Sequence, residues 1–199
     1  MNYTDWINFT FSNVNKDWCL SGIQRITAQE LIEHCITFFG DPMPIVKNTS
    51  REALMRVFDE MPSVDGFLGV LSRAEILFDL RRTLVQRHLG FFRTVFQTDG
   101  YDGKAFMWWE RLICASWRDG PRVYCDDAIC EELLTVLDHI LQTDSRICVK
   151  SALHGINEIG SSGPEGVADE ILRNFFRGKW AGDAELVAYA QEVAAGEAQ

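Results

Sequence analysis

Three segments of the sequence carry the same helix-start signal directly before an apolar run of helical period. They are "TAQE" at Thr27–Glu30, "TSRE" at Thr49–Glu52 and "SRAE" at Ser72–Glu75. In this pattern, a capping box, the first hydroxyl and the last carboxylate satisfy backbone amides that the first helical turn leaves unpaired. Strand signals, such as alternating apolar and polar residues bounded by turn residues, are nearly missing. The repeated signal predicts helices that begin near residues 27, 49 and 72.

Helical periodicity continues through the second half of the chain. The clearest case is "DDAICEELLTVLDHILQ" (126–142), where Asp126 and Asp127 supply the negative charge that a helix N-terminus favours. Further helices are predicted over 104–117, 144–159, 164–176 and 183–195, with Pro164 in a first turn and residues 196–199 frayed. The buried face of the 126–142 helix is predicted to carry Ile129, Cys130, Leu133, Leu134, Val136, Leu137, Ile140 and Leu141.

The predicted helices are joined by short connections, and no segment is long and polar enough to mark a domain boundary. We predict one helical domain over 1–199, with N-terminal helices over 1–100 and helix pairs over 103–195. A shift of 40 residues superposes "ERLICASW" on "KSALHGIN" and "AICEELLTVL" on "ADEILRNFFR". A period of about 40 residues is typical of HEAT-type repeats. The predicted fold class is therefore all-α, as a HEAT-like (α-α superhelix) array of antiparallel helix pairs.

Composition and charge limit the class of protein, the cellular compartment and the kinds of partner that this chain can have. Hydrophobic residues make up 47% of the chain and charged residues 24%, as in ordinary globular proteins. The apolar runs are shorter than the roughly 20 residues of a membrane-spanning helix, and the N-terminus lacks the pattern of a secretory signal. We expect a cytoplasmic protein with no membrane partner. The net charge of −10 argues against a nucleic-acid partner, because phosphates require a cationic face.

The six cysteines have neither metal-binding nor disulfide spacing. No CxxC pair occurs, and most cysteines stand among apolar residues, as in "HCITFF" and "RLICASW". We expect reduced, buried cysteines and no disulfide, structural metal or cofactor. If a metal were bound, His139, Cys148 and His154 would be the first candidate ligands, because they fall on two helices predicted to be adjacent.

The stretch "SALHGINEIG" (151–160) contains the residues with the most obvious chemistry. His154 and Glu158 are four residues apart on the predicted polar side of a helix, beside Lys150 and Ser151. Imidazole and carboxylate at this spacing suit a metal-ligand pair or an acid/base pair. The alternative is a surface His–Glu pair, or a histidine packed against the next helix, and the lack of further ligands favours it. The core stripe of this helix is predicted to be Val149, Ala152, Leu153, Ile156 and Ile159.

The segment "CVKSALHGINEIG", followed by "VADEILRNFF", resembles the C-terminal part of a family of uncharacterised bacterial HEAT-like proteins with an SALHGLGH-type helix. "FMWWERL" (106–112) resembles the aromatic helix that precedes it, and the likeness is best over residues 105–190. The resemblance implies a helical-repeat fold and no particular reaction. This chain has Asn157 and Glu158 where the pattern more often has Gly and His, so a role for that second histidine does not carry over.

Two further features bear on binding. Trp108 and Trp109 point about 100° apart on a helix, so either one of them anchors a binding surface or both are buried between two layers. Charge is also uneven: residues 126–199 hold 14 acidic and five basic side chains, whereas residues 73–93 hold five arginines and two acids. Arg81, Arg82 and Arg87 form either an anion site or a solvated helix face, and the uneven charge either steers a partner or is solvated.

Three classes of function compete for this chain. They are a protein-interaction module, an enzyme that uses polar groups around His154 and Glu158, and a toxin-neutralising (immunity-type) or other accessory binding protein. Almost every His, Asp and Glu falls on a predicted solvent face, which favours binding over catalysis. We predict a module without catalytic activity of its own that binds another protein, such as one with a basic patch. The predicted binding residues are Trp108, Glu110, Asp138, His154 and Glu158.

Overall fold

The computed structural model describes residues 1–12, 26–63, 66–98, 100–113, 126–160 and 163–198 of the 199-residue chain. Within those ranges every regular element is a helix and no strand occurs, which confirms the all-α prediction. None of the helices in these ranges is long and apolar enough to cross a membrane.

The helices are short to medium in length and follow one another closely. Up to residue 98 the elements are α1 (Tyr3–Ser12), α3 (Ala28–Gly40), α4 (Met43–Asn48), α5 (Arg51–Glu60), the 3-10 helix η1 (Phe67–Ser72), α6 (Phe78–Phe91) and the π-helical turn η2 (Phe92–Phe96). From residue 100 on they are α7 (Asp102–Ile113), α8 (Asp127–Leu141), α9 (Arg146–Ile159), α10 (Val167–Phe175) and α11 (Ala184–Ala195).

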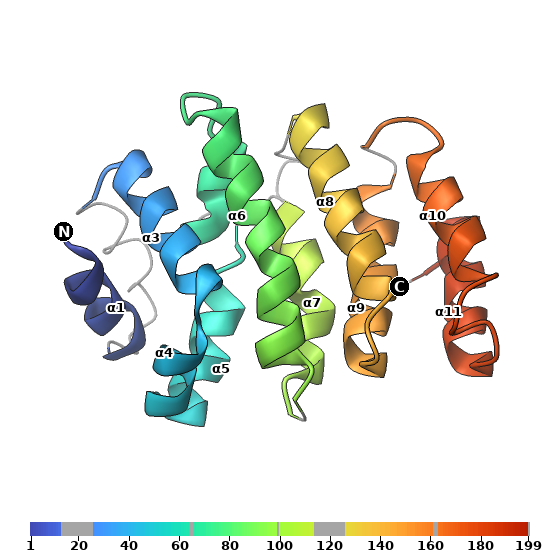
Figure 1. Cartoon of the computed structure of the whole chain (residues 1–199), viewed down its shortest axis with the longest axis horizontal. Helices are drawn as coiled ribbons and strands as arrows, with labels where there is room; N and C mark the ends of the chain where they lie inside the picture. The colour runs from blue at the N-terminus through green and yellow to red at the C-terminus, as the bar shows by residue number, and fades with distance from the viewer. Residues whose placement is uncertain (13–25, 64–65, 99, 114–125, 161–162, 199) are drawn as a thin grey trace.

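The helices pack in two layers, and Figure 1 shows them as a row from α1 at one end to α11 at the other. One layer contains α3, α6, α8 and α10, each in contact with the next. The second contains α5, α7, α9 and α11, again each in contact with the next, with α1 against α5. From α7 onward, successive helices alternate between the layers, and the apolar core lies between them.

The first predicted helix start is confirmed, and the second is wrong by one residue. The Thr27 hydroxyl accepts a hydrogen bond from the Glu30 amide (3.2 Å), and the Glu30 carboxylate accepts one from the Thr27 amide (2.8 Å), a complete capping box. At α5 the capping side chain is Ser50 rather than Thr49. The Thr49 hydroxyl instead donates to the Ile45 carbonyl (2.8 Å), which ties it to α4.

The third predicted helix start, at Ser72, is wrong. The apolar stretch before it forms the buried helix η1, and the Ser72 hydroxyl donates back to the Gly69 carbonyl (2.8 Å). Helix α6 begins only at Phe78, after Leu77, which provides no side-chain cap. Burial of the apolar side chains of η1 therefore overrides the local helix-start signal.

Helix α8 agrees with its predicted pattern throughout. All eight residues of the predicted apolar face are buried. Asp126 caps the helix, and its carboxylate accepts a hydrogen bond from the Ile129 amide (3.0 Å). Glu131 and Thr135 are exposed, and Asp138 is partly exposed. The agreement follows from the position of α8, which turns one broad face to the core and the other to solvent.

Both tryptophans of α7 are fully buried, so Trp108 does not anchor a binding surface as predicted. The Trp108 ring packs against Phe91 and Phe96, with ring centroids 5.4 and 5.2 Å apart. Trp109 stacks on Phe92 at 5.0 Å. Helix α7 has neighbours on several sides, namely α5, α9 and η2, and these bury side chains that point in different directions.

The C-terminal segments differ from the prediction in two places. Helix α10 begins at Val167, after Gly166 in the left-handed conformation (φ 80°), so Pro164 precedes the helix instead of standing in its first turn. The tail after α11 is not frayed up to Ala198, which is partly buried. The Ala198 carbonyl accepts a hydrogen bond from the Asn157 side-chain amide (3.3 Å), so this tail lies against the end of α9.

Candidate functional site

The small residues of "SALHG" allow α7 and α9 to pack closely. The Ser151 hydroxyl accepts a hydrogen bond from Trp109 Nε1 (3.0 Å) and donates to the Ala105 carbonyl. One turn later, a Cβ on Gly155 would lie 2.7 Å from Trp109 Cγ and 2.9 Å from Leu137 Cδ2. Only glycine fits that contact without displacing its neighbours. Ser151 is therefore buried, and its predicted position on a polar surface is wrong.

His154 is also buried, with an exposed fraction of 3%, because α7 and α11 cover that side of α9. Its Nδ1 shares a hydrogen bond of 3.1 Å with the Tyr189 hydroxyl of α11. Its Nε2 lies 3.5 Å from a Glu110 carboxylate oxygen of α7. The ring stacks on Phe106 at 4.1 Å, nearly parallel. His154 thus connects three helices, and the carboxylate beside it is Glu110 instead of Glu158.

Glu158 lies at the C-terminal end of the same side of α9. It is partly exposed and accepts a hydrogen bond from the Asn157 side chain (3.0 Å). Burial of the phenol, together with the negative charges of Glu158 and Glu192, raises the pKa of Tyr189 to about 12. Tyr189 is therefore a neutral hydroxyl at ordinary pH, and this end of α9 and α11 is acidic.

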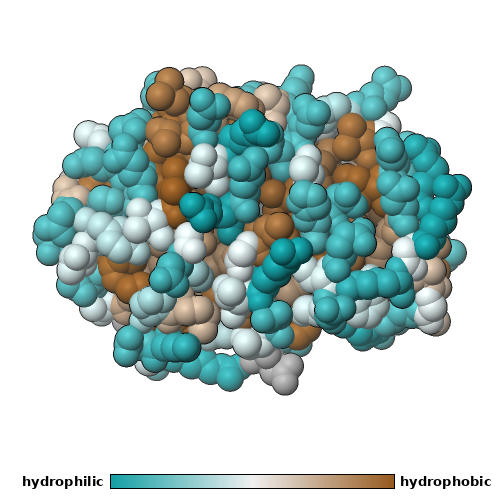
Figure 2. Space-filling model, in the orientation of Figure 1, coloured by the Kyte–Doolittle hydropathy of each residue, from teal (hydrophilic) through white to brown (hydrophobic). Residues whose placement is uncertain are grey.

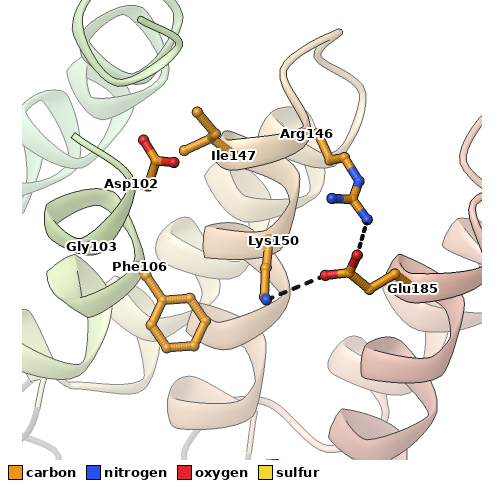
Figure 3. A pocket seen from close by; sticks show the side chains of 7 residues that line it. All are labelled: Asp102, Gly103, Phe106, Arg146, Ile147, Lys150 and Glu185. Carbon is orange, nitrogen blue, oxygen red and sulfur yellow. Dashed lines mark hydrogen bonds and ion pairs between the residues drawn. The ribbon is translucent and has the colours of Figure 1, made fainter. Parts of the chain in front are cut away.

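A pocket of about 440 Å³ lies at the other end of these helices, between the first halves of α7 and α9 and the start of α11 (Figure 3). Phe106 and Ile147 supply its apolar surface, and the charged side chains of α9 and α11 project beside them (Figure 3). The full lining is Asp102, Gly103, Phe106, Arg146, Ile147, Lys150 and Glu185.

The charged groups of the pocket form a network centred on Arg146. Its guanidinium donates to both Asp183 oxygens (2.9 and 3.3 Å) and to Glu185 (2.6 Å). Lys150, one turn later on α9, lies 3.7 Å from the other oxygen of Glu185. The hydrogen bonds from Arg146 hold the pKa values of Asp183 and Glu185 below their usual range and raise that of Arg146. Arg146, Asp183 and Glu185 are therefore charged near neutral pH.

The pocket and the His154 cluster belong to one continuous strip, which we name the α7–α9–α11 face. Its residues recur about one helical turn apart on each helix. They are Asp102, Phe106 and Glu110 of α7, Arg146, Lys150, His154 and Glu158 of α9, and Glu185, Tyr189 and Glu192 of α11. Five of these side chains are acidic and two are cationic, with both cations at the pocket end.

The structure brings together only part of the predicted binding set. Glu110 and His154 are in contact, and Glu158 follows them on the same face. Asp138 lies on α8, in the other layer, and Trp108 lies in the core. The pocket cations were not predicted, although the spacing of Arg146 and Lys150, four residues apart before His154, is a readable signal.

Two of the three arginines predicted to form either an anion site or a solvated helix face pair with acids of α8, while the third, Arg87, is exposed. Arg81 is only 6% exposed and pairs with Asp126 of α8 at 2.6 Å. Burial acts to raise the pKa of Asp126, but hydrogen bonds from Arg81 and the Ile129 amide outweigh this effect. The pKa of Asp126 therefore lies below its usual range. Arg82 pairs with Glu132 of α8 at 2.7 Å. The basic residues of α6 and the acidic residues of α8 therefore partly neutralise each other inside the fold.

The described cysteines are placed as packing residues. Cys35, Cys130 and Cys148 are buried, while Cys19, Cys114 and Cys125 lie outside the described residues. Burial and the charges of Asp127 and Asp126 raise the pKa of Cys130 to about 11. Across the described ranges, no group of three His, Cys, Asp or Glu side chains is arranged to hold a metal ion.

Among the described residues, exposed apolar side chains do not define a second candidate site. The face shown in Figure 2 is mostly hydrophilic, and its apolar residues form separate patches. In the part of the chain that the structure describes, the large exposed hydrophobic side chains are Leu77 and Phe78, at the start of α6. Two adjacent residues make too small a patch to define an interface.

Comparison with known proteins gives no relative from which a function can be transferred. No family model matches the chain, and no curated protein or solved structure is significantly similar to it. A functional conclusion therefore rests on the geometry of the α7–α9–α11 face.

Proposed function

We propose that this protein is a cytoplasmic interaction module that binds a segment of another protein along the α7–α9–α11 face. The observation that carries the proposal is the continuous strip of charged and aromatic side chains that leads from an open pocket to an acidic end. Packed helices hold this strip in place, which limits the ordering that binding requires. Catalytic activity is not part of the proposal, because His154 lies beneath Phe106 and its neighbours.

A HEAT-like arrangement of the whole domain is part of the same proposal. The 40-residue shift aligns α7 with α9 and α8 with α10. Each of these aligned helices is in contact with its counterpart, α7 with α9 in one layer and α8 with α10 in the other. Stacked repeats bury equivalent faces against each other in this way and leave an extended surface for partners.

We propose that the partner segment carries basic side chains for the acidic end of the face. Glu110, Glu158 and Glu192 come from three different helices and converge around Tyr189 and His154. Charge complementarity of this kind sets which partners bind and how fast they associate more than it sets affinity. A basic partner segment is thus favoured over an acidic one at this end.

Site-specific photo-crosslinking in the native cell tests the proposal. A photoreactive phenylalanine analogue replaces Glu192, which is exposed on the face, or Thr135, which is exposed on α8 in the other layer. We expect one identified protein to be captured from position 192 and not from position 135. Adding Glu158→Lys should abolish that capture, whereas Glu131→Lys on α8 should leave it unchanged. Equal capture from both positions would contradict the proposal, and so would capture from position 192 that is unchanged by Glu158→Lys.

A further inference from the structure

The pocket end of the α7–α9–α11 face contains a carboxylate site that one of the protein's own side chains occupies. Glu185 accepts a hydrogen bond from Arg146 (2.6 Å) with one oxygen and lies 3.7 Å from Lys150 with the other (Figure 3). A carboxylate bridges two cations, one helical turn apart, at the edge of an apolar pocket surface. The position of Glu185 therefore marks where an external carboxylate would sit.

Glu185 can leave this network without disturbing the hydrogen bonds between Arg146 and Asp183. Its side chain is 63% exposed, and it stands in the first turn of α11, where it can rotate into solvent. Asp183 caps α11 and keeps two hydrogen bonds to Arg146, so the guanidinium stays oriented when Glu185 moves away. Exposed ion pairs contribute little to stability, so the replacement of Glu185 by an external carboxylate costs little free energy.

We propose that this pocket binds the C-terminal residue of the partner segment, with its α-carboxylate between Arg146 and Lys150 in place of Glu185. The inference rests on the proposed function and names the group that the face recognises. The terminal side chain packs on Phe106 and Ile147, in a volume of about 440 Å³ that is larger than a carboxylate alone needs.

The surrounding charges favour a carboxylate over a phosphate. With Glu185 displaced, the two cations remain beside two anions, Asp183 on Arg146 and Asp102 across the pocket. Because these anions already balance the two cations, desolvation decides between ligands: removing a dianion from water costs about four times as much as removing a monoanion of similar size, whereas its attraction to the cations only doubles. Inorganic phosphate is therefore a discriminating control.

The two ends of the face also set the direction of the bound chain. Arg146 and Glu158 are separated by 12 residues of α9, a rise of about 18 Å that five or six extended residues span. The C-terminus lies at the pocket, and basic residues about five positions upstream reach Glu110 and Glu158. This order distinguishes the partner segment from a generally basic peptide.

Titrations with peptides of defined ends test the site. The probe is acetyl-Lys-Arg-Lys-Ser-Leu-Phe with a free C-terminal carboxylate, compared with the same peptide as its C-terminal amide, with 3-phenylpropanoate and with inorganic phosphate. Binding is followed by NMR of the Lys150 side-chain ammonium and of the Glu185 carboxyl carbon. We expect the free-acid peptide to shift both signals saturably and to bind at least tenfold more tightly than the amide. For 3-phenylpropanoate we expect a Kd on the order of a few millimolar, and for phosphate no saturation.

Variants separate recognition from folding. Glu185→Gln removes the internal competitor and should tighten peptide binding about two- to fivefold. Lys150→Met should weaken it about two- to fivefold, and Glu131→Gln on α8 should change nothing. Equal binding of acid and amide, or unchanged binding in Glu185→Gln, overturns the carboxylate site. If 3-phenylpropanoate binds as tightly as the peptide, the claim of a partner's terminus is overturned. Capture from position 192 is a separate measurement, so the proposed function stands or fails independently.

Discussion

Acidification should destabilise this protein through one buried histidine, His88 of α6. Its side chain is fully buried and stacks on Phe39 at 4.7 Å, with Trp108 and Trp109 beside it. The Nδ1 atom is hydrogen-bonded to the Leu84 carbonyl (2.9 Å), and within the described residues Nε2 has no hydrogen-bond partner. Burial lowers the pKa of His88 from 6.5 to about 4, despite opposing backbone hydrogen bonds.

The sign and size of the effect follow from that pKa. Between pH 6.5 and pH 4 the unfolded chain binds a proton at His88 that the folded chain does not bind, so stability falls as the pH falls. Above pH 6.5 both states are neutral at this position and its contribution is constant. The free energy of unfolding should therefore drop by about 3 kcal/mol from this residue between pH 8 and pH 4.

Urea unfolding of the wild type and of His88→Phe at several pH values measures this contribution. The phenylalanine keeps an aromatic ring in the cluster and removes the titration, so other groups cancel when the two pH profiles are subtracted. We expect the difference to be flat above pH 7 and to shift by about 3 kcal/mol, in favour of the variant, as the pH falls to 4. Parallel profiles would show that His88 is not buried as a neutral ring and would refute the reasoning.

Three further predictions concern helix starts and packing. Thr27→Ala should lower the free energy of unfolding by about 1 kcal/mol, because Thr27 caps α3. Ser72→Ala should lower it by less than about 0.5 kcal/mol, because Ser72 does not cap α6. Equal losses in urea unfolding would contradict this. Gly155→Val should cost about 2–3 kcal/mol, because its side chain would overlap the indole packed against it; an unchanged thermal midpoint would show that α7 and α9 are not in close contact. Asp126→Ala should cost about 3 kcal/mol, because it leaves Arg81 buried without its anion and also removes the N-cap of α8. Adding Arg81→Met should restore at least about 1 kcal/mol, since it removes the unpaired charge but not the loss of the cap; additive losses would rule out the pairing.

Sequence reasoning succeeded where a helix has one buried face. Helix α8 borders solvent on one side, so its apolar period maps directly onto burial, and every predicted core position is buried. For α9, which contacts α7, α8 and α11, the predicted core stripe is buried in full, but the predicted polar side is wrong at Ser151 and His154. A helix surrounded in this way buries polar residues as well, and the pattern of Ser151 and His154 cannot indicate which neighbour covers them.

Tertiary packing also overrides a local helix-start signal, at Ser72. The motif at Ser72 has the residues of a capping box, but the apolar segment before it forms the buried helix η1. Helix α6 therefore begins only at Phe78. The candidate site was predicted in part, since Glu110, His154 and Glu158 lie on one face. Residues from α7, α9 and α11 form the pocket, and their meeting depends on contacts between helices that no single-helix pattern contains.

The central claim is that a partner segment lies along the α7–α9–α11 face, and carboxyl-group footprinting of the captured complex tests it most directly. Carbodiimide labelling modifies accessible Asp and Glu side chains, and mass spectrometry locates the modified positions. The account predicts that labelling of Glu158 and Glu192 falls severalfold in the complex, while Asp127 and Glu131, on the exposed side of α8, are labelled as in the free protein. Protection of the α8 carboxylates with unchanged labelling of Glu158 and Glu192 would contradict it.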